Sequence, residues 1–178
     1  MFLTSDTHFG HTNIIKYCAR PFASADEMDA ELIRRWNSVV GVQDVVLHLG
    51  DFAFKSRADI NAILAQLNGH IYLVMGNHDE PKKIQKAVFE RVSYEPQSSE
   101  YPHTALWIDG NLVAYLSHYP TIAWSSVMPL FFGHIHTALN KKIEDGPYNV
   151  VGTYDVGVDN NDFTPVPFDV AFRKAWRE

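Results

Sequence analysis

The chain has 178 residues, of which 46% are hydrophobic and 20% charged, a balance typical of a globular domain with a sizeable core. The net charge of −6 argues against a general electrostatic grip on nucleic acid, although bound metal ions can create a local positive site in an acidic protein. No apolar run approaches the roughly 20 residues of a membrane span, and no signal peptide is visible. A single cysteine, Cys18, cannot form an internal disulfide. We therefore expect one domain over residues 1–178, in the reducing cytoplasm and away from membranes.

Strands and helices alternate in the first half of the chain. Apolar runs predict strands over residues 1–5, 45–49 and 71–75, and helical periodicity predicts helices over residues 24–40 and 56–67. Ser24 and Glu27 form a capping box at the start of the first helix, and Gly69 follows the end of the second. Pro81 suits the first turn of a further short helix.

Short strands dominate the second half. Residues 105–108 and 112–116 flank the turn sequence Asp109-Gly110-Asn111 and predict a hairpin. Further short strands are predicted over residues 130–132, 148–151, 154–158 and 167–170. The whole pattern predicts an α/β fold in layers, with sheet between helices.

Five of the predicted strands end in side chains that can bind metal ions. The stretches are FLTSDTH, VVLHLGD, IYLVMGNHD, VAYLSH and LFFGHIH. They supply Asp6, His8, Asp51, Asn77, His78, Asp79, His118, His134 and His136. Because ligand sites in α/β sheets gather beyond the carboxyl ends of strands, we expect these groups to converge on one site.

Each motif by itself has a simpler explanation. A strand-terminal LGD or GHIH often marks only a surface turn, and Asp79 alone could cap the helix at Pro81. Five such accidents with the same polarity along a strand are much harder to accept than one shared site. On extended chain, residues i and i+2 point the same way, so Asp6 and His8 should face one point, as should His134 and His136.

The ordered set D-x-H, G-D, G-N-H-D, S-H and G-H-x-H resembles the calcineurin-like metallophosphoesterases, from Asp6 to His136. The stretches DTHFGHTNII, RPF, HLGDFAF and VGVDNNDFTPVPF look like a short branch of this family found in bacteria and phages. The resemblance implies an αββα sandwich, with two mixed sheets flanked by helices and a two-metal centre at the strand ends.

The resemblance also implies a ligand set for each metal. One ion would take Asp6, His8, Asp51 and His136, and the other Asp51, Asn77, His118 and His134. Asp51 would bridge the two, since a carboxylate has two oxygens to share. Oxygen and imidazole ligands without thiolate favour Mn, Fe, Zn, Co or Ni, with Mn as our first expectation.

Other polar residues near these motifs are candidates for roles other than metal binding. The resemblance implies that His78 protonates the leaving oxygen while Asp79 orients its ring; alternatively, His78 is only a hydrogen-bond donor beside the ligands. His11, Asn13 and Arg20 are candidate substrate contacts, although a salt bridge explains Arg20 equally well. His48 has the opposite strand parity to Asp51, so we expect it in the core or behind the ligands. Aromatic residues near the ligand motifs form either a rim or part of the core; they are Phe52, Phe54, Tyr119 and Trp124.

The function expected from these features is phosphoester hydrolysis, with direct attack by a metal-bridging hydroxide on a monoester or a diester. The substrate would be a small phosphoester or a nucleic-acid end, and no obligate protein partner is evident. One alternative is a nuclease or end-processing phosphodiesterase, since single-stranded ends need few contacts. A second is a non-catalytic scaffold, which should have lost ligands; none of the expected ligands is missing here.

Overall fold

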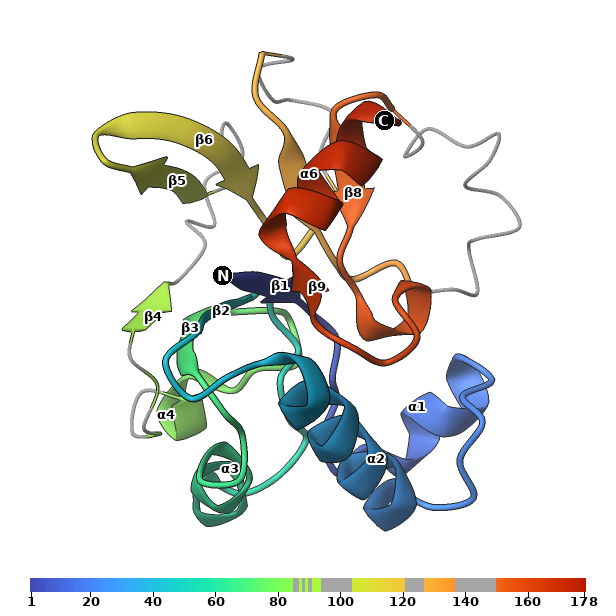
Figure 1. Ribbon diagram of the computed structural model, residues 1–178. Helices are drawn as coiled ribbons and strands as arrows, with labels where there is room; N and C mark the ends of the chain where they lie inside the picture. Colours follow the sequence, from blue (N-terminus) through green and yellow to red (C-terminus); the bar gives the residue numbers. More distant parts are fainter. Residues whose placement is uncertain (85–86, 88, 90, 94–103, 121–126, 137–149) are drawn as a thin grey trace.

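Two β-sheets organise the protein in this computed structural model, which describes residues 1–84, 87, 89, 91–93, 104–120, 127–136 and 150–178 (Figure 1). The first sheet has the strand order β4-β3-β2-β1-β9. Its strands are β1 (Phe2–Thr4), β2 (Val45–His48), β3 (His70–Val74), β4 (Arg91–Ser93) and β9 (Val166–Pro167). Strands β1 to β4 are parallel and β9 is antiparallel to β1, so the carboxyl ends of four strands lie together.

The second sheet has the order β5-β6-β7-β8. Its strands are β5 (Thr104–Ile108), β6 (Asn111–Leu116), β7 (Leu130–Phe132) and β8 (Thr153–Asp155). The β5–β6 pair is the predicted hairpin, and Asp109 and Gly110 at its tip have φ values of 49° and 77°. Two successive left-handed residues match the twist of a two-residue hairpin turn. The other two pairs are parallel, so both sheets are mixed.

Four helices come from the first half of the chain and lie beside the first sheet (Figure 1). They are α1 (Thr12–Tyr17), α2 (Ala25–Val39), α3 (Arg57–Leu64) and α4 (Pro81–Ile84). At the start of α2, Ser24 Oγ accepts the Glu27 N–H at 3.1 Å, and the Glu27 carboxylate accepts the Ala23 N–H at 2.8 Å. The predicted capping box is therefore present, with its return bond displaced by one residue.

The two faces of the first sheet bury different partners. Trp36 of α2 and Ile60 of α3 pack in one cluster with Val46 of β2. The next residue, Leu47, joins the second cluster, which includes Phe131 of the second sheet. The alternation of a strand thus places one hydrophobic layer between helices and sheet, and another between the two sheets.

The C-terminal part of the chain differs from the prediction. Residues 167–170 were expected to form a strand, but β9 ends at Pro167 and helix α6 (Phe168–Trp176) follows at once. Its apolar residues Phe168, Ala171, Phe172 and Ala175 recur at helical spacing and pack in the second cluster. The predicted strand covered only residues 167–170, which are too few to show helical periodicity. Among the described residues, no helix is long and apolar enough to cross a membrane.

Smaller departures concern the ends of elements. Helix α1 and strand β4 were not predicted, and α3 ends at Leu64 rather than at residue 67. The strand expected over 148–151 falls partly outside the described residues, and its last residue, Val151, lies in a turn. Strand β8 ends at Asp155, and the 3-10 turn η2 (Val158–Asn160) follows where the prediction continued the strand to Val158.

Candidate metal centre

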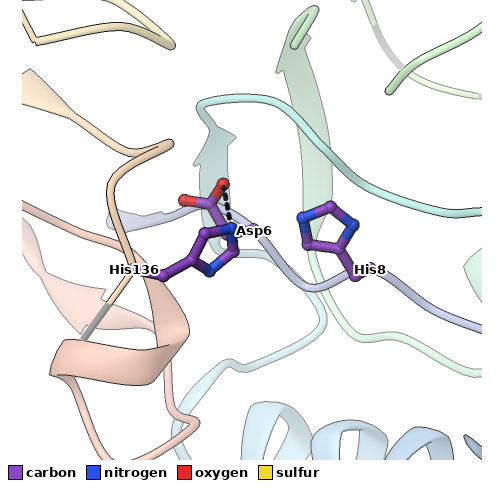
Figure 2. Close-up of side chains that lie close together, drawn as sticks. All are labelled: Asp6, His8 and His136. Atoms are coloured by element: carbon purple, nitrogen blue, oxygen red, sulfur yellow. Dashed lines mark ion pairs between the residues drawn. The ribbon is translucent and has the colours of Figure 1, made fainter. Parts of the chain in front are cut away.

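The five polar strand ends converge in the structure. The loops after β1 and β2 run side by side, because Asp6 N–H donates to Gly50 O at 2.9 Å and His8 N–H donates to Asp51 O at 3.0 Å. These strand ends form two groups of potential metal ligands, each with its ligand atoms within 4.8 Å of one another: Asp6, His8 and His136, and Asp51, His118 and His134. A third group of this kind, Cys18, His136 and Asp159, shares His136 with the first. Figure 2 shows the first group, in which His136 Nε2 lies 3.9 Å from Asp6 Oδ1.

The backbone reaches this arrangement through strained turns, not through extended chain. Asp6 and His8 have φ values of 58° and 51°, Asp51 has 56°, and His134 and His136 have 73° and 47°. Left-handed conformations of non-glycine residues cost energy and cluster at functional sites. The prediction that i and i+2 residues face one point is therefore wrong in its reason. His134 and His136 belong to different groups in the structure.

Each site carboxylate is held through one oxygen and presents the other. Asp6 Oδ2 accepts hydrogen bonds from Ser5 Oγ at 2.6 Å and from the His134 N–H at 2.9 Å. Asp51 Oδ1 accepts the His78 N–H at 2.8 Å. These bonds tie each carboxylate to a loop from another strand, so the two groups of ligands are fixed relative to one another.

Two glycines allow this close approach. A Cβ at Gly76 would collide with Asp51 Oδ1, and a Cβ at Gly133 would collide with Ser5 Oγ and Asp6 Oδ2. Neither position needs a left-handed backbone, so lack of space, not conformation, requires glycine there.

The atoms left over are those that a metal ion would bind. Among the described residues, four buried side-chain polar atoms have no hydrogen-bond partner, and three of them are Asp6 Oδ1, His8 Nε2 and Asp51 Oδ2. An unpaired buried carboxylate oxygen is costly, whereas a divalent cation would satisfy all three atoms. Burial, followed by the charge of His136, holds the pKa of His8 well below its usual range, which keeps its ring in the neutral, ligating form.

The second group supports the same conclusion through its tautomers. His118 Nδ1 lies 2.8 Å from Leu49 O, which can only accept, so Nδ1 carries the proton and Nε2 of the neutral ring is an acceptor. This Nε2 lies 3.0 Å from Asn77 Oδ1 and 3.3 Å from His134 Nδ1. With the His118 ring neutral, Nε2 and Asn77 Oδ1 are both acceptors, and one cation bound to both would satisfy them. The donor set thus fits a metal ion in both groups.

Asp51 links the groups through a single atom. Its Oδ2 lies 3.4 Å from His8 Nε2 and 3.5 Å from His118 Nε2. Oδ1 accepts the His78 N–H, whereas Oδ2 has no hydrogen-bond partner. Only Oδ2 faces both groups.

Behind His136 lies a buried carboxylate that the sequence analysis did not assign. His136 Nδ1 donates to Asp159 Oδ2 at 2.7 Å, which directs Nε2 toward Asp6. Burial lowers the pKa of His136, but hydrogen bonds with Asp159 and Cys18 outweigh burial and raise it to about 10. A carboxylate that orients a ligating imidazole is a common feature of metal sites. The stretch VGVDNNDF was noted only for its resemblance, and nothing local marked Asp159.

Arg20 forms a salt bridge with Asp159, which was the alternative to a substrate contact. Its side chain is 0% exposed, with Nε and Nη2 each 2.8 Å from an oxygen of Asp159. Nη2 and Nη1 also donate to the carbonyls of Asp6 and Thr7, at 2.7 and 3.1 Å. With its donors used inside the protein, Arg20 fixes the first ligand loop to Asp159.

His78 and Asp79 occupy different environments. The His78 side chain is exposed, and its ring centroid lies 5.2 Å from that of His8. Asp79 is buried and accepts three backbone N–H donors, from Gly76, Asp51 and Phe52, at 2.8–2.9 Å. The expected orientation of the His78 ring by Asp79 is absent from the described contacts, and so is a cap on α4. Asp79 instead fixes the backbone that carries Asp51, because buried N–H donors require an acceptor.

His48 matches its expectation as a core residue behind the ligands. It is fully buried; its Nδ1 accepts the Gly50 N–H at 3.2 Å, and Nε2 lies 3.0 Å from Thr7 Oγ1. Thr7 Oγ1 donates to Phe52 O at 2.8 Å, so His48 Nε2 carries the proton and donates to Thr7. His48 therefore joins the two ligand loops.

The remaining candidates lie in different environments. His11 Nδ1 is 3.2 Å from His8 Nδ1, and Asn13 is exposed on α1. Phe52 is a core residue, whereas Phe54 and Tyr119 are 58% and 38% exposed. Trp124 lies outside the described residues.

Comparison with known proteins finds relatives that match different lengths of the chain. The chain is 48% identical over 82 residues to an uncharacterised protein of Methanocaldococcus jannaschii, covering 45% of this chain and 47% of that protein. The Gene 66 protein of Mycobacterium phage L5 is 32% identical over 131 residues, 67% of this chain and 62% of the phage protein. That of phage D29 is 27% identical, over 89% and 87% of the two chains. The chain thus spans about half to two thirds of the length of the first two relatives.

The fold is shared with a solved structure. A crystal structure of a protein of unknown function from Aquifex aeolicus has a TM-score of 0.66 and 25% identity, over 93% of this chain and 94% of that one. The family model described as calcineurin-like phosphoesterase matches residues 2–178, which include every strand end that contributes to the two ligand groups. The chain therefore belongs to the calcineurin-like phosphoesterases.

Proposed function

We propose that the protein is a phosphohydrolase that acts through two divalent transition-metal ions. The observation that carries this proposal is the position of Asp51 Oδ2, unpartnered and buried, within 3.5 Å of a ring nitrogen from each ligand group. One ion would be held by Asp6, His8, His136 and Asp51, and the other by Asn77, His118, His134 and Asp51. The absence of thiolate from this set favours Mn, Fe, Zn, Co or Ni, and we propose Mn as the first metal to test.

Charge supports phosphate as the group bound. Two divalent ions bring a charge of +4 against −2 from Asp6 and Asp51, so an acidic protein would carry a positive centre. Two such ions would supply the activation of water at neutral pH and the neutralisation of charge on the phosphoryl oxygens. The chain contributes the geometry: Ser5, His134 N–H and His78 N–H hold the carboxylates, while Leu49 O and Asp159 orient two imidazoles.

His78 is proposed as the proton donor to the leaving oxygen. Its ring is exposed and lies beside His8, so it can reach an ester oxygen at the centre without displacing a ligand. Its backbone N–H is bonded to Asp51 Oδ1, which fixes the residue next to the bridging carboxylate. The proposed substrate is a phosphoester, either a small molecule or a nucleic-acid end.

The test combines metal content with hydrolysis on one preparation. Chelator-treated protein saturated with Mn²⁺ should contain two ions per chain by elemental analysis and hydrolyse a chromogenic monoester or diester. Asp51→Asn should lose metal from both positions, whereas Asp59→Asn, an exposed carboxylate on α3, should keep two ions and the rate. A single ion at saturation, or a rate indifferent to chelator, would refute the two-metal proposal.

A further inference from the structure

An exposed phenylalanine borders the metal centre on the side of His78. Phe54 is 58% exposed, and its ring lies almost parallel to that of His11, with centroids 4.6 Å apart and an interplanar angle of 18°. The His78 ring meets Phe54 edge to face, at 6.2 Å and 68°. Single exposed apolar residues are ordinary on protein surfaces, but this one is stacked beside the proposed proton donor.

The backbone around Phe54 is fixed while its ring remains accessible. Phe54 N–H donates to Phe9 O at 2.8 Å, and Phe9 N–H donates to Phe52 O at 3.0 Å. Phe9 and Phe52 are fully buried, with ring centroids 5.3 Å apart. The buried residues Phe9 and Phe52 therefore hold the backbone of Phe54 in place. An aromatic group that stacks on the Phe54 ring would bind a preorganised surface.

The rings form a continuous surface that reaches the centre. His8 lies 5.2 Å from His78 and 5.2 Å from His11, and His11 lies 5.8 Å from His78, measured between centroids. The group that leaves phosphorus must lie beside the residue that protonates it. The leaving alcohol would therefore extend from the centre past His78 and over Phe54.

We propose that Phe54, braced by His11, is a platform for a planar aromatic leaving group, so that the preferred substrates are esters whose leaving alcohol carries an aryl ring or a nucleobase. This inference rests on the proposed phosphohydrolase function. Stacking on an aromatic ring favours planar groups over saturated rings of the same carbon number.

The test uses two esters with matched leaving groups. 2-Phenylethyl and 2-cyclohexylethyl esters have the same carbon skeleton and an alkoxide leaving group, but only the first presents a planar ring. They would be prepared as phosphate monoesters and as methyl diesters, and the series that the Mn²⁺-loaded protein hydrolyses faster would be used. Wild type should prefer the phenylethyl ester in kcat/KM, and Phe54→Leu should reduce that preference by about 3- to 10-fold. Phe54→Trp should retain it.

Two matched variants locate the platform. Tyr119 is exposed on the opposite group, with its ring 4.7 Å from His134, and Trp107 is 60% exposed on β5. Tyr119→Leu and Trp107→Leu should leave the phenyl preference unchanged. Calorimetric binding of 2-phenylethylphosphonate and 2-cyclohexylethylphosphonate should show the same Phe54-dependent difference without turnover.

The outcomes separate this inference from the function beneath it. If Phe54→Leu changes both esters by the same factor, or if the preference depends on Tyr119 instead, the platform is refuted while the phosphohydrolase stands. If the metal-loaded wild type hydrolyses neither series nor the chromogenic esters, the proposed function fails and the platform with it. If it hydrolyses only the chromogenic esters, the phosphonate comparison decides, and equal binding of the two phosphonates refutes the platform alone.

Discussion

Asp159 and His136 form a hydrogen bond of 2.7 Å that links a turn near the C-terminus to the first group of ligands. Arg20 binds both oxygens of the same carboxylate and two carbonyls of the first ligand loop. Three segments far apart in the sequence thus control where one imidazole points. Asp159 and Arg20 thus determine how His136 is oriented within the first group of ligands.

Arg20→Lys tests this dependence. Lysine keeps the charge but has three donors in place of five, so it leaves buried acceptors unsatisfied and lets Asp159 shift. We expect the affinity for one of two ions to fall about 10- to 100-fold. Metal titration followed by the visible spectrum of bound Co²⁺ would show one perturbed position.

The matched control is Arg34→Lys, an exposed arginine that pairs with Glu31 on α2. Water screens an exposed ion pair, so this variant should bind both ions as wild type does. Equal effects from the two substitutions would show that the Arg20 network does not position His136.

His78→Ala separates chemistry from metal binding. The variant should keep two ions, because the ligands do not include this side chain, and should lose roughly 10²–10⁴ in turnover. The loss should be greater for an alkoxide leaving group, which needs a proton, than for p-nitrophenolate, which does not. Rates for both esters and metal content would be measured on the same preparation.

His70→Ala, at the other end of β3, is the control for removing a histidine and should leave rates and metal content unchanged. Loss of an ion from His78→Ala, or an equal defect for both leaving groups, would contradict a role as proton donor.

Asp79→Asn should act on the protein's stability and on metal binding more than on proton transfer. Burial raises the pKa of Asp79 to about 6 despite the opposing hydrogen bond from Gly76, so at neutral pH the carboxylate is mainly ionised and accepts three N–H donors. An asparagine side chain has only one acceptor oxygen, and its NH₂ group would face a backbone N–H donor that then has no acceptor. We expect a loss of about 1–3 kcal/mol in the free energy of unfolding and weaker metal binding. Urea unfolding and metal titration measure both; a variant with normal metal affinity and a defect only for poor leaving groups would restore the idea that Asp79 orients His78.

His48 makes the stability of the metal-free protein depend on pH. Burial, followed by the charge of His118, lowers the pKa of His48 to about 3 in the folded state, against about 6.5 in the unfolded chain. The unfolded state therefore binds more protons between these values, so stability is fully present above pH 6.5 and is lost as pH falls toward 3. Between pH 7.5 and 5.5 this residue should account for about 1.4 kcal/mol of lost stability.

The check is urea unfolding of wild type and His48→Gln at both pH values, with chelator present. The variant should lose about 1.4 kcal/mol less than wild type over this interval, whatever its absolute stability. The same pH dependence in both proteins would show that His48 is not held neutral in the fold.

Several features of this protein follow from local sequence. The apolar face and cap of α2, the Asp109-Gly110 hairpin and the five polar strand ends depend on neighbours within a few residues, so their patterns are visible along the chain. The order of the strand-end motifs also pointed to the family that the comparison later showed.

How those strand ends meet depends on contacts between segments that are far apart along the chain. Asp159 contacts His136 across 23 positions and Arg20 across 139, and no periodicity marks such a contact. The choice of Asp51 Oδ2 over Oδ1 depends on an N–H donated from the next strand end. The pairing of His136 with Asp6 and of His134 with Asp51 depends on left-handed turns that packed neighbours impose. The types of candidate ligand, and their positions after strands, could be predicted from the sequence because they depend on residue identity and local pattern. The atoms that face one another at the site could not be predicted in this way. They depend on hydrogen bonds between distant segments, which set the histidine tautomers, the carboxylate oxygen that stays unpaired and the left-handed backbone conformations.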